Sequence, residues 1–193
     1  MKTTIHLKNN PDGKIGIQID QLGEIYEEIH AKNFQEIIFD FSNIDFLYAT
    51  FILGLAVLVS DLKNKGTTVT FINQNGSISS YLSAICFPDG LMPDQYEQWP
   101  NILENSSTKT FLPIVNFSNK TSKEETVLRN DIIGLFGKLL AARLGFGTSI
   151  HTGISYFISE FTDNVVEHSG QERGWLFYQH YPTKEYVEIS IMD

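Results

Sequence analysis

Short apolar segments alternate with longer amphipathic segments over the first 87 residues, and this alternation constrains the fold more than any other feature of the sequence. Runs rich in β-branched and aromatic residues are typical of strands, and the segments that follow them have a helical period. The expected strands are 3–7, 15–19, 36–41 and 67–72, and the expected helices are 20–30, 50–64 and 77–85. The order ββαβαβα predicts an α/β domain with a mixed sheet and helices packed on it.

Two details of this domain follow from local residue types. A turn-rich loop, 9–13, contains Pro11 and Gly13, so it predicts an opening hairpin between the first two strands. The segment 36–41 is apolar on both faces, which predicts a central strand.

Residues 88–109 interrupt the alternation. Prolines, glycine, asparagines and serines gather there, and such a stretch forms neither a good helix nor a good strand. The segment 110–117 is strand-like but contains Pro113, which has no N–H group to donate, so we expect it at a sheet edge. We therefore assign residues 1–87 to the first domain and 88–120 to a connection.

From residue 121 the pattern changes to two long helices and a pair of strands. Acidic residues at 124 and 125 suit the first turn of a helix that we expect over 122–144, and a second helix is expected over 148–168. Strands are expected at 175–181 and 186–192. Residues 121–193 thus predict a second domain, an incomplete α/β sandwich.

Composition excludes several classes of function. The formal net charge of −9 argues against a nucleic-acid partner, because neutralising phosphates requires clustered Lys and Arg. The single cysteine, Cys86, excludes an internal disulfide and a cysteine-based zinc cluster. The longest apolar stretch, 46–59, is shorter than the roughly 20 residues of a membrane span. The first residues lack the apolar region of a signal peptide. We expect a cytoplasmic protein without a membrane partner.

The segment 40–55, DFSNIDFLYATFILGL, places a strand, a tight loop and an apolar helix in succession. It resembles the core of STAS domains, the family of anti-sigma-factor antagonists, and the resemblance covers residues 1–87. Regulated members are phosphorylated at the position that Thr50 occupies. Here Tyr48, Ala49 and Phe51 replace the Asp, Ser and Gly of the motif. Thr50 is therefore either a phosphorylation site or the N-cap of the following helix, and in the second case Thr50→Ala would cost about 1 kcal/mol.

The segment 160–168, EFTDNVVEH, lies inside the second long helix. Ile154, Ile158, Phe161 and Val165 share one face at helical spacing, and we expect this face in the core. Glu160, Asn164 and His168 follow one another at intervals of one turn on the neighbouring edge. An amide oxygen is a hard ligand suited to Mg²⁺, and a carboxylate one turn away can take a proton from an attacking hydroxyl or water. The alternative is the solvated polar edge of an amphipathic helix.

This second segment resembles the N box of GHKL ATP-binding domains, the fold shared by sensor histidine kinases, gyrase-type ATPases and anti-sigma-factor kinases. The resemblance covers 122–193. It implies that Glu160 is catalytic, as the general base, and that Asn164 is the Mg²⁺ ligand. It also implies that Asn164, His168 and Asp193 bind the nucleotide, with Asp193 reading adenine. Asp193 would open a box, Asp-x-Gly-x-Gly, of which only the first residue is present.

The sequence thus predicts a signalling protein with a STAS-like domain ahead of a GHKL-type kinase or ATPase domain. We expect the chain to end at an artificial boundary or in a truncated gene. ATP and Mg²⁺ would then be cofactors of the complete protein and would not bind this chain. Expected partners are another protein, the STAS-like domain of the same chain, or a second copy through the exposed C-terminal strands. Two alternatives stay open, a non-enzymatic interaction module and a single α/β domain that binds no nucleotide.

Overall fold

The structure, a computed structural model, describes residues 1–9, 15–106, 108–120, 122–144 and 148–193. The chain divides into two compact units, Met1–Asp89 and Gly90–Asp193. Each unit has a three-stranded sheet of its own, parallel in the first and antiparallel in the second. The predicted α/β class is confirmed.

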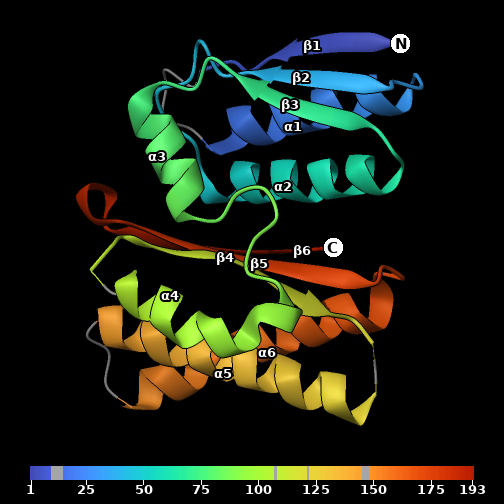
Figure 1. Ribbon diagram of the computed structural model, residues 1–193. Helices are drawn as coiled ribbons and strands as arrows, with labels where there is room; N and C mark the ends of the chain where they lie inside the picture. The colour runs from blue at the N-terminus through green and yellow to red at the C-terminus, as the bar shows by residue number, and fades with distance from the viewer. Residues whose placement is uncertain (10–14, 107, 121, 145–147) are drawn as a thin grey trace. The chain divides into compact units, whose positions relative to one another are not determined.

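The first unit alternates strands and helices, and α1 and α2 cover one face of its sheet (Figure 1). Its elements are β1 (Lys2–His6), α1 (Ile15–His30), β2 (Glu36–Asp40), α2 (Ala49–Asn64), β3 (Thr68–Ile72) and α3 (Gly76–Ala84). The strand order is β1-β2-β3, so the central position predicted for the segment 36–41 is confirmed. Ile37 and Phe39 of β2 are fully buried and form the centre of the core.

The expected hairpin and the mixed sheet are wrong. Residues 15–19 open α1 instead of forming a strand, and all described pairings in this sheet are parallel. The alternating Ile15, Ile17 and Ile19 imitate the period of a strand, yet all three are at least a third exposed. The helix instead buries Gln18 and Gln21 near its start. The turn expected over 9–13 falls mostly on residues 10–14, outside the described residues.

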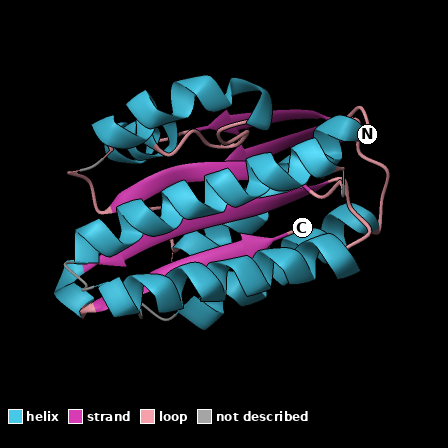
Figure 2. Ribbon diagram, turned by 90° about the horizontal axis from the view of Figure 1, so that it is seen from below, coloured by secondary structure: helices cyan, strands magenta, loops and turns pink. Residues whose placement is uncertain are grey.

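The second unit places its long helices on one face of an antiparallel sheet. Its elements are η1 (Pro93–Gln98), α4 (Trp99–Asn105), β4 (Phe111–Ser118), α5 (Lys123–Leu144), α6 (Thr148–His168), β5 (Arg173–Tyr181), η2 (Pro182–Lys184) and β6 (Tyr186–Met192). Helices α5 and α6 pack against each other, and α6 contacts β5 and β6. Figure 2 shows the long helices in front of the strands.

Strand β4 is an outer strand of this sheet, in the order β4-β5-β6, as Pro113 predicted. The register with β5 shifts between Leu112 and Val115, so the proline lies at the irregularity, where a missing N–H group is least disruptive. Residues 90–118, most of the predicted connection, contribute η1, α4 and β4 to the second unit. Trp99 anchors this part: it is buried, and its indole N–H donates to the carbonyl of Met92 at 3.1 Å.

Strand β6 is the other outer strand, and the dimer expected through it stays a prediction. Among the described residues, no helix is both long enough and apolar enough to cross a membrane.

Candidate functional site

Helix α6 presents the predicted site residues to solvent. Glu160, Asn164 and His168 are all exposed, and they lie one turn apart along the helix. The Glu160 carboxylate accepts a hydrogen bond from the Tyr156 hydroxyl, which raises the pKa of Tyr156. His168 ends the helix, and its Nε2 atom lies 3.9 Å from the carboxylate of Glu167.

The buried face of α6 differs from the predicted one. Ile158 is fully buried as expected, but Phe161 is 47% exposed, so its assignment to the core is wrong. Thr162 takes the buried place instead, because its hydroxyl donates to the Ile158 carbonyl at 2.7 Å and so satisfies its polarity inside the helix.

The fourth predicted residue, Asp193, lies on a different element. It follows β6 directly and is exposed. No hydrogen bond or ion pair joins Asp193 to Glu160, Asn164 or His168, all four of which the structure describes. The three residues of α6 therefore form one group, and Asp193 makes no hydrogen bond or ion pair with them.

Exposed aromatic rings accompany the polar residues of α6. Tyr156, Phe157 and Phe161 are between 47% and 66% exposed. The rings of Phe157 and Phe161 contact each other, with centroids 4.4 Å apart. Exposed apolar groups that cluster in this way are typical of binding surfaces.

In the first unit, α1 holds the loop before α2. The Gln18 side chain donates to the Phe46 carbonyl at 2.9 Å and accepts from the Tyr48 amide at 2.8 Å. Helix α2 begins at Ala49 with Tyr48 as its N-cap, and no side chain caps it. Thr50 is thus the second residue of the helix. Its assignment as the N-cap is wrong, and the stability loss expected for Thr50→Ala loses its basis.

Asp40 organises the ends of all three parallel strands. Its Oδ1 atom accepts from the Asn73 amide group and from the Ser42 backbone N–H, both at 2.9 Å. Its Oδ2 atom lies 2.9 Å from Nδ1 of His6. The hydrogen bond from Asn73, supported by those from Ser42 and His6, holds the pKa of the Asp40 carboxyl below its ordinary value, against the opposing effect of burial.

This network predicts a pH-dependent stability. Because the pKa of Asp40 is lower in the folded protein, its contribution is fully present above the unfolded value, near 3.8, and is lost as pH falls through the folded value. At pH 7 the wild type should have a higher Tm than Asp40→Asn. The difference in Tm should shrink as the pH is lowered below about 3.8. Circular dichroism melts between about pH 7 and about pH 2 measure this. Asp20→Asn, an exposed change in the same unit, should show no such convergence. A constant Tm difference for Asp40→Asn would contradict the prediction.

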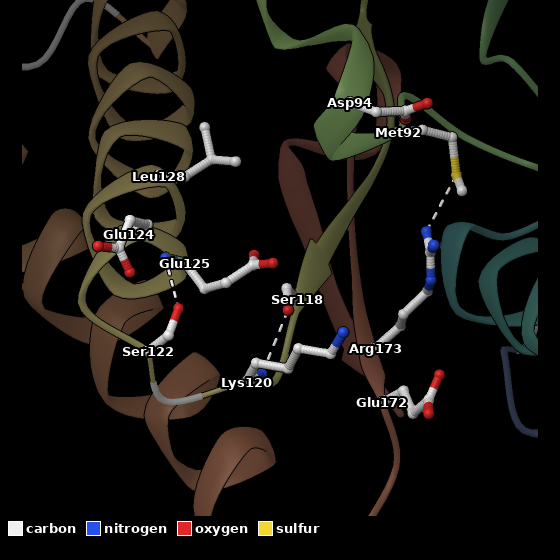
Figure 3. A pocket seen from close by; sticks show the side chains of 10 residues that line it. All are labelled: Met92, Asp94, Ser118, Lys120, Ser122, Glu124, Glu125, Leu128, Glu172 and Arg173. Atoms are coloured by element: carbon white, nitrogen blue, oxygen red, sulfur yellow. Dashed lines mark hydrogen bonds between the residues drawn. The ribbon is translucent and has the colours of Figure 1, made fainter.

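A polar pocket of about 580 Å³ lies in the second unit (Figure 3). It is bounded by the start of α5, the end of β4, the start of β5 and η1. Its lining residues are Met92, Asp94, Ser118, Lys120, Ser122, Glu124, Glu125, Leu128, Glu172 and Arg173. None of the four predicted site residues lines it.

Sequence reasoning overlooked both the Asp40 network and this pocket. His6 and Asp40 each end a strand, and Asn73 follows one, so their positions at strand ends were a usable signal. The pocket had no such signal, because Lys120 and Arg173 are far apart in sequence and come together only through the pairing of β4 with β5.

Comparisons of the chain with family models, with curated proteins and with solved structures found no match.

Proposed function

We propose that this chain is the regulatory and nucleotide-binding part of a cytoplasmic signalling protein. Residues 1–87 serve as a STAS-like regulatory domain, and 121–193 are the first part of a GHKL-type ATP-binding domain that acts as a kinase or an ATPase. ATP binding would also require the glycine-rich boxes, which residues 121–193 do not contain. The 193-residue chain is then expected to show no saturable ATP binding.

The observation that carries this proposal is the row of exposed polar residues on α6, Glu160, Asn164 and His168. Glu160 and Asn164 are exposed one turn apart, on a helix whose opposite side is anchored by the buried Ile158. Buried packing fixes the helix, so the two side chains are offered to a ligand from a rigid support.

The residues fit a Mg²⁺-nucleotide on chemical grounds. Mg²⁺ uses one or two protein oxygens and takes its other ligands from phosphates and water, so the single amide oxygen of Asn164 is a sufficient protein ligand. Bound Mg²⁺ would neutralise charge on the phosphates. Glu160, one turn away, would accept the proton of the attacking hydroxyl or water. His168 and Asp193 would contact the nucleotide.

The first unit offers a point of regulation. Thr50 lies in the first turn of α2, where the helix dipole favours a negative group such as a phosphate. The STAS-like domain would act either as an internal phosphorylation substrate or as a docking platform. A short connection between two modules raises their effective concentration to roughly millimolar, which favours contact within the chain.

The test is Mg²⁺-dependent ATP binding by the protein extended beyond Asp193 to include the glycine boxes. Asn164→Ala should abolish the Mg²⁺-dependent part of the binding measured by calorimetry, because water cannot replace the amide oxygen in the same position. Glu167→Ala is the matched control on the same helix and should bind like wild type. Wild-type affinity in Asn164→Ala would refute the proposal.

A second candidate is a non-enzymatic module that binds a protein partner, and the exposed rings of Tyr156, Phe157 and Phe161 favour it. The codons that follow Asp193 in the gene distinguish the two. Asp-x-Gly-x-Gly and a glycine-rich lid support nucleotide binding, whereas a stop codon supports the interaction module.

A further inference from the structure

The pocket in Figure 3 holds charges of both signs that do not pair with each other. Lys120 and Arg173 contribute positive charge, and Asp94, Glu124, Glu125 and Glu172 contribute negative charge. None of these six side chains forms an ion pair within 4.0 Å with any described residue. The lining therefore presents a net charge of −2, from two cations and four carboxylates.

The positive wall is supported from behind. Arg173 is positioned by Asn116, whose Oδ1 atom accepts from the guanidinium at 3.2 Å. The buried Arg129 donates to the carbonyls of Ser118 and Lys120, at 3.2 and 3.3 Å, and so fixes the backbone of this wall.

Two donors behind the same wall lack an acceptor. They are Nε of Arg129 and the side-chain amide nitrogen of Asn116, both fully buried. Arg129 also has no carboxylate partner among the described residues. Buried charges are normally paired, so the buried guanidinium of Arg129 adds positive charge behind a wall that also carries Glu172 beside Arg173.

The opposite wall is the first turn of α5. Glu125 extends from it into the pocket, toward Ser118, and Glu124 lies beside it (Figure 3). The backbone N–H of Glu125 donates to the Ser122 hydroxyl at 3.3 Å. Lys120 and Arg173, with Glu172 beside them, thus lie across the cavity from Glu125 of α5, and the cavity is large enough for a small molecule.

We propose that this pocket binds a free basic amino acid, such as lysine or arginine. The α-carboxylate pairs with Lys120 and Arg173, and the cationic groups pair with Glu124 and Glu125. The excess of carboxylates favours a ligand with net positive charge over a neutral or acidic amino acid. This site is separate from the residues assigned to nucleotide binding, so it supplies an input signal that does not depend on that assignment.

The test is an NMR titration of the 193-residue chain at about pH 7 with L-lysine, L-arginine, cadaverine and L-glutamate. Lysine or arginine should give saturable shifts in amides near Lys120 and Glu125. Cadaverine, which is lysine without its carboxylate, should bind about tenfold more weakly or worse, and glutamate should not saturate.

Paired variants locate the site. Lys120→Met and Glu125→Gln should each weaken lysine binding about tenfold or more. Lys184→Met and Glu167→Gln, exposed changes outside the pocket, should leave it unchanged. Thermal melts confirm that each variant is folded. The proposal is overturned if neither basic amino acid saturates at about 10 mM, if cadaverine matches lysine, or if Lys120→Met binds like wild type.

Discussion

Replacing Glu160 by alanine in the complete protein is expected to slow ATP turnover by about 10²–10⁴-fold, the range typical for the loss of a general base. Mg²⁺-ATP binding should change little, because the carboxylate is assigned a role in proton transfer and not in holding the metal. Glu160 is exposed on α6, so its loss removes no core packing. Single-turnover kinetics and calorimetry measure the two effects separately.

The control for this variant is Glu167→Ala. Glu167 has the same charge, lies on the same helix and is exposed, but it is two turns away. It should turn over ATP like wild type. If Glu160→Ala and Glu167→Ala have equal rates, Glu160 belongs to a solvated helix edge and the proposed mechanism fails.

Replacing Phe39 by alanine is expected to destabilise the first unit by about 3–5 kcal/mol, the cost of removing a large buried ring and leaving a cavity. Phe39 is fully buried in the central strand, and its ring stacks on that of Phe71 with centroids 6.0 Å apart. Domains of this size have total stabilities of about 5–15 kcal/mol, so the loss removes a large part of the available stability.

Urea unfolding followed by circular dichroism, with hydrogen exchange of the β2 amides, measures this loss. Phe46→Ala is the matched control, because the same residue type is 38% exposed in the same unit. It should cost less than about 1 kcal/mol. Equal costs for the two variants would show that β2 is not the centre of the core.

Helices and strands whose apolar residues follow a single clear spacing were predictable from the sequence. The segments 148–168 and 186–192 match the observed bounds of α6 and β6, and the central strand was identified from its apolar residues. Where two periods compete, prediction failed. Ile15, Ile17 and Ile19 fit a strand, yet the segment is the start of a helix that buries Gln18 against the loop 46–48 and Ile25 and Ile29 further along. Pairing within each sheet also depends on contacts far apart in sequence, so the parallel arrangement was not predictable from local patterns.

The candidate site was predictable where its residues share one helix. The spacing of Glu160, Asn164 and His168 directly gives a common side of α6, although the precise buried face was misjudged at Phe161. Thr162 shows why. A threonine whose hydroxyl donates to a carbonyl of its own helix can be buried in the core, and a prediction from the pattern of hydrophobic residues does not include it.

The Gln18 side chain makes its two hydrogen bonds to main-chain atoms of the loop before α2, the Phe46 carbonyl and the Tyr48 amide. These two hydrogen bonds therefore do not depend on the side chains of the loop. The exception is proline at position 48, because proline has no N–H group. Leu47 and Tyr48 are buried and therefore constrained by packing, whereas Phe46 is 38% exposed. Position 46 can therefore change over evolution while the backbone keeps its anchor and the start of the helix stays in place.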